Sequence, residues 1–510
     1  MAPPGNQAAN SEDKPQPAAG RTEILERESD RHAEVSRGHI RWLATEGPNG
    51  SLKMGLNEKS SHSMTRDGNA SGKQAYLSPA MLEDETITGN RKGDTPVNVP
   101  QVLERVLERG NLLQALRQVV RNKGGPGVDG MTVDQLPGHL KEHWPRRKAE
   151  LISGKYKPQP VKRVEIPKSG GGVRKLGVPT VTDRLIQQAL MQVSQAQWDS
   201  SFSQSSYGFR PKRSAHQAVV SAQGYLSEGY DWVVDIDLEK FFDRVDHDVL
   251  MHRVRERVKD SRVLKLITSF LKAGVSVEGV VEPTREGTPQ GGPLSPLLAN
   301  LLLDELDKEL ESRGHRFVRY ADDCNIYVRS KRAGERVMES VSRFLTRRLK
   351  LKVNREKSAV DRPWKRTFLG FTFTSRRPNK RRVSAGAIEE FKQKVRRLTY
   401  RTRGKKIRQI VGELIVYLIG WKGYYGFTEA PSPLRDLDKW IRRRLRCYVW
   451  KQWGRRRYKE LRARGVSREL AWNTAKSAHG PWRISQSPAL SYALPGKFFR
   501  GLGLQCLVAC

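Results

Sequence analysis

The feature that most constrains the fold is a pair of adjacent aspartates between two short apolar runs. The stretch FVRYADDCNIYV reads as a strand, a tight turn and a second strand, with Asp322 and Asp323 at the turn. Two carboxylates held this close repel each other and raise each other's pKa, so burying both is costly without a cation nearby. Mg²⁺, which binds carboxylates and phosphate oxygens, would remove that cost. Taken alone, the pair could also be a polar hairpin turn.

A third carboxylate follows another apolar run. WVVDID reads as a buried strand that ends at Asp237, and this strand can bring the acid beside the aspartate turn. Two metal ions held by such acids could lower the pKa of a primer 3′-hydroxyl and stabilise a leaving pyrophosphate. Asp235 on the same strand is a rival ligand, and Asp237 could instead cap a helix that opens with Phe241 and Phe242. Three further acids are expected on the solvated face of that helix: Asp243, Asp246 and Asp248.

The order of apolar patterns along the chain predicts an α+β fold. Residues 102–123 and 183–198 have helical periodicity, and between them two β-prone runs flank the SGGG turn at 169–172. TPQGGPLSPLLANLLLDELD is a Gly/Pro turn that leads into an apolar helix, and FLGFTFT is a short strand. Alternating strands and helices with antiparallel hairpins are typical of an α+β domain.

Charge divides the chain into two parts. The net charge is +38, yet residues 1–95 carry 12 basic and 14 acidic residues, and the remainder carries 81 basic and 41 acidic residues. Such an excess favours a polyanionic partner, nucleic acid first, and no apolar run approaches the length that spans a bilayer. Few large apolar side chains occur in the first 95 residues, which predicts a disordered tail. Four cysteines without CxxC spacing indicate neither a disulfide framework nor a zinc site.

Beyond residue 376 the pattern is helical, basic and aromatic. Residues 376–470 carry 29 Lys and Arg against 8 Asp and Glu, with Trp and Tyr recurring among them. Basic side chains neutralise phosphates and aromatic rings stack on unpaired bases, so this part fits RNA binding. Trp421, Tyr424 and Tyr425 are explained at least as well as helix-packing core. Because adjacent arginines are hard to bury, two clusters are the expected phosphate contacts: Arg442, Arg443 and Arg444, and Arg455, Arg456 and Arg457.

The succession of these blocks resembles a known family. IPK, GG, R and LGVPTVTDRLIQQAL, then DLEKFF, TPQGGPLSPLLANLLLDELD, YADD and FLGF, are similar in this order to group II intron-encoded reverse transcriptases/maturases. YADD is common to reverse transcriptases in general, whereas PQGGPLSPLLAN is much more specific to this family. NKGGPGVDG resembles the family's N-terminal extension of the fingers, and IGWKGYYGF resembles its thumb, domain X. The resemblance covers roughly residues 98–505.

The resemblance implies a right-hand polymerase followed by an α-helical thumb. The expected divisions are a disordered tail in 1–95, fingers and palm in 96–375, the thumb or maturase domain X in 376–455, and a short basic RNA- or DNA-binding tail in 456–510.

The implied activity is RNA-directed DNA synthesis from a primer with two Mg²⁺ ions per active site. It would be combined with binding of a group II intron RNA, to assist splicing and mobility by target-primed reverse transcription. The implied partners are the intron RNA, an RNA template with a DNA primer, target DNA and dNTPs, but no membrane. The implied location is a cytoplasmic, DNA-associated ribonucleoprotein, expected in a bacterium, and the oligomeric state stays open.

The family's metal-binding residues carry over to matching positions. Asp237, Asp322 and Asp323 match the metal-binding aspartates, and Leu238 matches the residue that lends a backbone carbonyl to the metal. Phe242 matches the aromatic residue under the incoming sugar, although it could be ordinary core.

Further matches concern the nucleotide and the primer. Lys168 and Arg174 match basic residues that hold the nucleotide triphosphate, and Gln290 matches a residue that lines the nucleotide pocket. Gly370 in FLGF matches the primer-grip strand. Each has a plain alternative: a solvated charge, a turn residue or a core strand.

One departure from the family pattern concerns the C-terminus. Many members end in an HNH-type endonuclease with His and Cys metal ligands, but the last sixty residues here hold one histidine, His479, and no CxxC pair. The chain therefore resembles the endonuclease-lacking branch. Two other functions stay open: a reverse transcriptase with another task, as in retron or anti-phage systems, and a splicing factor whose polymerase site is vestigial.

Overall fold

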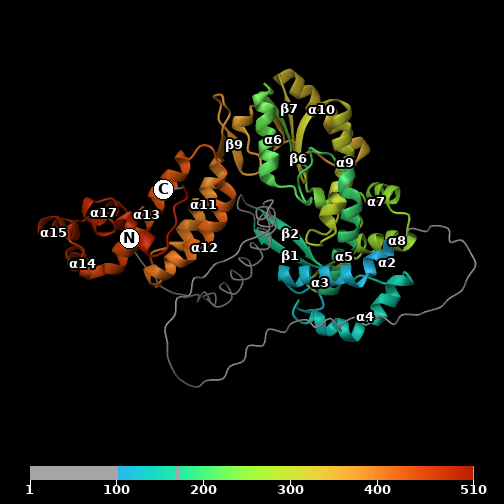
Figure 1. Cartoon of the computed structure of the whole chain (residues 1–510), viewed down its shortest axis with the longest axis horizontal. Helices are drawn as coiled ribbons and strands as arrows, with labels where there is room; N and C mark the ends of the chain where they lie inside the picture. Colours follow the sequence, from blue (N-terminus) through green and yellow to red (C-terminus); the bar gives the residue numbers. More distant parts are fainter. Residues whose placement is uncertain (1–101, 168–171, 509–510) are drawn as a thin grey trace, which may run out of the picture.

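A computed structural model of the chain describes residues 102–167 and 172–508. A part containing β-sheets lies on the right of Figure 1, and a helical part, in orange and red, lies on the left. The predicted α+β fold followed by a helical part is confirmed. The tail predicted for 1–95 lies outside the described residues.

The palm is built on a four-stranded antiparallel sheet with the order β6-β7-β3-β8. Its strands are β3 (Trp232–Ile236), β6 (Arg316–Tyr320), β7 (Asp323–Val328) and β8 (Ala359–Asp361). Alternate side chains point to opposite faces, so Val233 packs in one hydrophobic core and Val234 in another. Helix α6 (Ala215–Ser227) covers the first face, and α10 (Lys331–Arg348) covers the second.

The fingers carry a second sheet, β2-β1-β4-β5, with β1 and β2 forming the predicted hairpin around the SGGG segment. The helix predicted over 102–123 divides at Glu108, whose ψ of 135° is extended. The strands are β1 (Val161–Pro167), β2 (Val173–Val178), β4 (Val275–Val277) and β5 (Val280–Glu282). The helices around them are α2 (Val102–Leu107), α3 (Arg109–Asn122), α4 (Leu136–Ile152), α5 (Val181–Trp198), α7 (His247–Arg257), α8 (Ser261–Leu271) and, reaching the palm, α9 (Ser295–Ser312).

The helical part is the thumb, and it extends further along the chain than the sequence predicted. One hydrophobic core runs from Val383 to Leu507, and Asp438 accepts hydrogen bonds from the N–H groups of Leu507 and Val508. The described part of the predicted tail, 456–508, is therefore folded onto the thumb. Its helices are α11 (Ala385–Leu398), α12 (Ile407–Tyr425), α13 (Ser432–Trp453), α14 (Arg457–Ala463), α15 (Arg468–Lys476), α16 (Pro481–Ile484), α17 (Pro488–Ala493) and α18 (Gly496–Gly501).

Palm and thumb are joined by a small two-stranded ladder. β9 (Phe371–Phe373) pairs antiparallel with β10 (Arg381–Val383), so a division at residue 375 falls inside a hairpin. Among the described helices, none has the length and apolar character needed to cross a bilayer.

Candidate active site

The palm sheet brings the three predicted aspartates to one end of neighbouring strands. β3 and β7 pair antiparallel with Ile236 opposite Cys324, so Asp237, the next residue, lies beside Asp323. Across the hairpin Tyr320 pairs with Asp323, which leaves Ala321 and Asp322 as the two turn residues.

The surroundings of these carboxylates favour a cation. Burial raises the pKa of Asp323 to about 7, and repulsion from Asp322, Asp235 and Asp237 adds to the effect. The side chain still reaches solvent on one side, but the protein around it removes much of its water. The pKa of Asp322 is also raised, by burial first and then by Asp237. Positive charge placed among these groups would stabilise their ionised forms.

A pocket of about 330 Å³ opens beside the acids. Lys357 lies in its wall with Nζ 3.8 Å from Asp237 Oδ2. Asp235 also faces the pocket, but one of its oxygens accepts hydrogen bonds from Arg366 Nε and Nη2 at 2.8 and 2.6 Å. Arg366 thus pairs closely with the rival ligand, whereas in the described part of the chain the carboxylate of Asp237 has a more distant cation, Lys357. The full lining is Asp235, Asp237, Asp323, Glu356, Lys357, Arg366, Thr367 and Phe368.

The donor set fits a hard divalent ion. All three side chains offer carboxylate oxygens, and the Leu238 backbone faces away from its partner Val353, because the ladder bonds on either side are made by Glu239 and Asn354. In residues 102–167 and 172–508 no group of three or more His, Cys, Asp or Glu side chains lies close enough together to hold a metal ion. Mg²⁺ also takes phosphate oxygens and water as ligands, so the protein need not supply all of them.

The aromatic pair after β3 does not open an α-helix. Phe241–Asp243 form a single 3-10 turn, which Lys240 enters with a φ of +49°. The helix α7 starts only at His247, because Asp246 caps it by accepting hydrogen bonds from two backbone N–H groups. Asp246 also pairs with Lys350 at 2.9 Å, so it is a structural cap and not a freely solvated residue.

The 3-10 turn presents the two phenylalanines differently. Phe241 is buried and Phe242 is half-buried, with ring centroids 5.1 Å apart at 70°. The carbonyl of Phe242 accepts a 2.6 Å hydrogen bond from the N–H of Thr288, in the TPQGG segment. The backbone of Phe242 is therefore held against that segment, and the residue as a whole is half-buried.

The TPQGG segment in turn lies against the fingers. The carbonyl of Gln290 accepts a 2.8 Å hydrogen bond from Gly177 of β2, and a Cβ on Gly291 would lie 2.6 Å from the carbonyl oxygen of Gly177. Arg174 stands exposed on the same strand and acts electrostatically on Asp322. Three of the predicted nucleotide residues thus border one region, while Lys168 lies outside the described residues.

The FLGF block forms a two-residue turn that packs against the thumb and is hydrogen-bonded to it. Leu369 and Gly370 have φ values of 52° and 78°, and the flanking Phe368 and Phe371 exchange both backbone hydrogen bonds. A Cβ on Gly370 would lie 2.5 Å from the Tyr425 hydroxyl, and the Tyr424 hydroxyl donates a 2.8 Å hydrogen bond to the Leu369 carbonyl. Nothing in the sequence pattern links these two blocks.

The aromatic residues of IGWKGYYGF are packing residues. Trp421 is buried against Phe391, and Tyr424 and Tyr425 both lie against Phe371 of the palm. This matches the core alternative that the sequence left open.

The two arginine clusters differ in how many of their side chains are exposed and how many are engaged in contacts within the protein. Arg444 donates to the Thr399 hydroxyl and to the carbonyls of Arg396 and Thr399, so it closes the end of α11. Arg443 stacks on Trp482 at 3.8 Å and also donates to its carbonyl. By contrast, Arg455 and Arg456 are exposed. Arg457 lies over Trp450 at 4.8 Å, and Arg442 is half-buried.

One residue that the sequence pattern does not single out touches the aspartate turn directly. A Cβ on Gly208 would lie 2.2 Å from the backbone nitrogen of Ala321. Ala321 has a φ of 58°, which is unusual for alanine. The backbone at Gly208 therefore packs directly against a turn with an unusual backbone conformation. Only a residue without a side chain fits there.

Comparison with known proteins agrees with this geometry. Residues 166–373 match the family "Reverse transcriptase (RNA-dependent DNA polymerase)", and residues 388–465 match "Group II intron, maturase-specific domain". The first match covers the palm with the aspartate turn, and the second covers most of the thumb. The fold and site thus define a reverse transcriptase.

Two relatives and one solved structure are similar to parts of this chain. Protein YkfC of Escherichia coli is 33% identical over 307 residues, which cover 52% of this chain and 81% of that protein. Group II intron-encoded protein LtrA of Lactococcus lactis is 36% identical over 236 residues, 46% of this chain and 39% of LtrA. A chain of a partial Cas6-RT-Cas1–Cas2 complex has 25% identity and a TM-score of 0.32, over 48% of this chain and 42% of that one.

The chain belongs to the family of group II intron-encoded reverse transcriptases and maturases. It is an RNA-directed DNA polymerase joined to a splicing maturase domain, and enzymes of this family use divalent metal ions. It spans less than half of the length of LtrA.

Proposed function

We propose that this chain extends a DNA primer on an RNA template, using dNTPs and two Mg²⁺ ions held by Asp237, Asp322, Asp323 and the Leu238 carbonyl. The observation that carries the proposal is the group of carboxylates that the palm sheet brings together at the turn: the pKa values of Asp322 and Asp323 are raised, and their neighbour Asp235 is paired with Arg366. When bound, the metal ions would activate the primer 3′-hydroxyl and stabilise the leaving pyrophosphate.

The surrounding residues would orient the substrates. Arg174, with Lys168, would hold the triphosphate from the fingers side, since a guanidinium matches phosphate oxygens in shape and charge. Gln290 would line the nucleotide pocket, and the Gly370 turn would support the primer end. Primer extension on an RNA template with purified protein tests this function, and it separates a polymerase from a splicing factor with a vestigial site.

The thumb would bind the group II intron RNA, and the protein–RNA particle would insert into target DNA by using it as the primer. The maturase-specific domain and the excess of basic residues after 376 support this. We place such a particle in a bacterial cytoplasm, where intron RNA and target DNA meet. Splicing of the cognate intron at low Mg²⁺, with and without protein, tests the maturase activity.

Replacing Arg455 and Arg456 by Gln should weaken RNA binding and flatten its salt dependence. Both side chains are exposed, and the removal of each phosphate-binding charge should lower the slope of log affinity against log salt by roughly 1. Filter binding over a salt series measures this. Replacing Arg347 and Arg348 on α10, which are also exposed, removes the same charge from the palm and serves as the control. Equal slopes in the two double variants would show that Arg455 and Arg456 face away from the RNA.

Phe242→Val should increase the use of ribonucleotides. The half-buried ring would lie under the incoming sugar, and a ribose 2′-hydroxyl there would clash and lose its water without gaining a hydrogen bond. Such a loss corresponds to roughly ten- to a hundredfold discrimination. Incorporation of ribo- and deoxyribonucleotides in one assay measures the ratio. Phe241→Val is the control because that ring is buried, and a change of ratio only in this control would mean that the wrong ring was chosen.

A further inference from the structure

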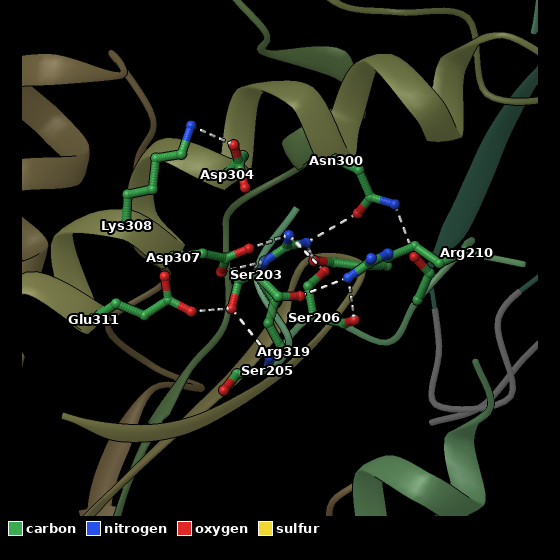
Figure 2. A network of polar contacts seen from close by, with 12 residues as sticks. Ser203, Ser205, Ser206, Arg210, Asn300, Asp304, Asp307, Lys308, Glu311 and Arg319 are labelled. Carbon is green, nitrogen blue, oxygen red and sulfur yellow. Dashed lines mark hydrogen bonds and ion pairs between the residues drawn. The ribbon is translucent and has the colours of Figure 1, made fainter. Parts of the chain in front are cut away.

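A buried arginine lies two residues before the catalytic turn. Arg319 of β6 has no exposed surface, and its guanidinium uses all five N–H groups (Figure 2). Nε and Nη2 donate to Asp307 at 2.7 and 2.5 Å, and Nη2 also donates to the Ser206 hydroxyl at 2.8 Å. Nη1 donates to the Asn300 side chain at 3.0 Å and to the carbonyl of Ala321 at 2.8 Å.

The last of these contacts reaches the turn itself. Ala321 has a positive φ, which an alanine rarely adopts, and its carbonyl belongs to the peptide unit that continues into Asp322. A hydrogen bond to this carbonyl fixes the orientation of that peptide. The orientation of the Asp322 backbone, and with it the direction of the Asp322 side chain, therefore depends on the position of the Arg319 guanidinium.

The position of Arg319 is set by two other segments. Asp307 and Asn300 belong to α9, which places a rigid helix behind the guanidinium. Ser206 belongs to a loop that also pairs with β6 through the backbone: Arg319 N–H donates to Ser205, and Tyr207 N–H donates to Arg319, both at 2.9 Å. The strand is thereby fixed from both sides.

A second buried arginine, Arg210, stabilises this loop. Arg210 donates to the carbonyls of Ser203 and Ser206 and forms a 2.8 Å ion pair with Asp199. The Asn300 side chain also donates to the carbonyl of Gly208, at 2.8 Å. Figure 2 shows how these groups surround Arg319.

Stability alone does not explain an ion pair here. Removing two charges from water is costly, and a well-packed apolar pair of similar volume often stabilises a protein as much or more. What an apolar pair could not do is donate a hydrogen bond to the Ala321 carbonyl. The guanidinium fork provides several directed bonds at once, which a lysine cannot reproduce.

We propose that Arg319 is a positioning residue of the polymerase site, which acts through the Ala321 carbonyl to set the direction of the Asp322 carboxylate. The proposal rests on the polymerase function proposed above. Arg319 does not touch substrate, so its loss should lower turnover without changing the binding of nucleotide or RNA.

The experiment replaces the buried pair by apolar side chains of similar volume, Arg319→Met with Asp307→Leu. This variant avoids an unpaired buried charge and should therefore fold. We expect wild-type RNA affinity and a KM for dNTP within about twofold of wild type, because the residues that bind RNA and nucleotide lie elsewhere. We expect kcat to fall about 10- to 100-fold, since small displacements of a reacting group have effects of this size. Hydrogen exchange without metal or substrate should become faster in peptides covering residues 318–326 and in the contacting loop around Ser206.

The matched control is another ion pair between α9 and its surroundings, Arg257 and Asp304, joined at 3.2 Å with Asp304 buried. Arg257→Met with Asp304→Leu removes a similar pair that does not contact the turn. It should leave both kcat and exchange at 318–326 at wild-type values. If both double variants behave alike, or if the Arg319 variant extends primers at the wild-type rate, the proposal is overturned.

Two further outcomes also decide the matter. If the Arg319 double variant does not fold, Arg319→Lys takes its place. Lysine keeps the positive charge beside Asp307 but lacks the forked guanidinium, so we expect the same fall in kcat and the same faster hydrogen exchange in the turn. Wild-type values of both quantities overturn the proposal. If the wild-type protein itself fails to extend primers, the proposed function fails. Local exchange in the turn still tests whether Arg319 positions it.

Discussion

Asp322→Asn should abolish primer extension while RNA binding stays nearly unchanged. The amide keeps the size of the side chain but removes the negative charge that would hold a metal ion at the turn. Removal of one preorganised electrostatic interaction typically lowers turnover by about 100- to 1000-fold, and the absence of a metal ion should cost more. RNA affinity should stay within about twofold because it depends on the basic surface. Primer extension and filter binding on one preparation measure both quantities.

Asp243→Asn is the matched control for this substitution. Asp243 is an exposed aspartate six residues after Asp237, so the same chemical change there removes a charge close to the site without touching the turn. We expect wild-type extension from it. Extension by the Asp322 variant at the rate of this control would refute the assignment of Asp322 to the metal site.

Gly208→Ala should damage both folding and polymerisation. The added methyl group would lie 2.2 Å from the nitrogen of Ala321 and 2.9 Å from the carbonyl carbon of Tyr320. Both are backbone atoms of the catalytic hairpin, so neither can move aside without shifting the turn. Overpacking of this kind costs about 1–3 kcal/mol or more. Thermal unfolding and primer extension should both report the loss.

Gly224→Ala separates this steric effect from the general effect of glycine replacement. Gly224 lies within α6, and a Cβ there would meet nothing within 4 Å. Because alanine favours helix over glycine by about 1 kcal/mol, this variant should be as stable as wild type or more so. A Gly208 variant with unchanged stability and rate would mean that the loop and the turn are not packed as described.

The strands and long helices could be predicted because their patterns are local. The runs around Asp237 and Asp322 are apolar and short, and each forms the expected strand of the palm sheet. The Phe241–Phe242 pair shows where local pattern fails. The sequence predicted a helix there, but the left-handed Lys240 and the cap at Asp246 reduce it to one 3-10 turn.

The residues that support the site could not be predicted, because their partners are distant in sequence. Arg319 in VRYADD reads as an ordinary polar strand residue, yet its partners lie 12 residues away at Asp307 and 113 residues away at Ser206. No periodicity indicates such pairings. The arginines of α13 show the same limit: Arg443 and Arg444 look alike in sequence, but one stacks on Trp482 and the other closes α11.

The packing of the C-terminal residues could not be predicted for a related reason. Between 456 and 508 the helices are short, and each contributes only a few buried side chains, such as Leu461, Ala471 and Leu490. No single segment has a long amphipathic face. The shared hydrophobic core forms only when all of these short helices pack together with α13.

The interlocked turn at Leu369 and Gly370 limits how this enzyme can move. Tyr425 lies against Gly370, and Tyr424 is hydrogen-bonded to Leu369, so helix α12 of the thumb is attached to the loop that would support the primer end. A movement of the thumb relative to the palm must either move this loop as well or break the contacts of Tyr424 and Tyr425 with it. The proposed binding of RNA by the thumb and the proposed support of the primer end by this loop would then be mechanically coupled.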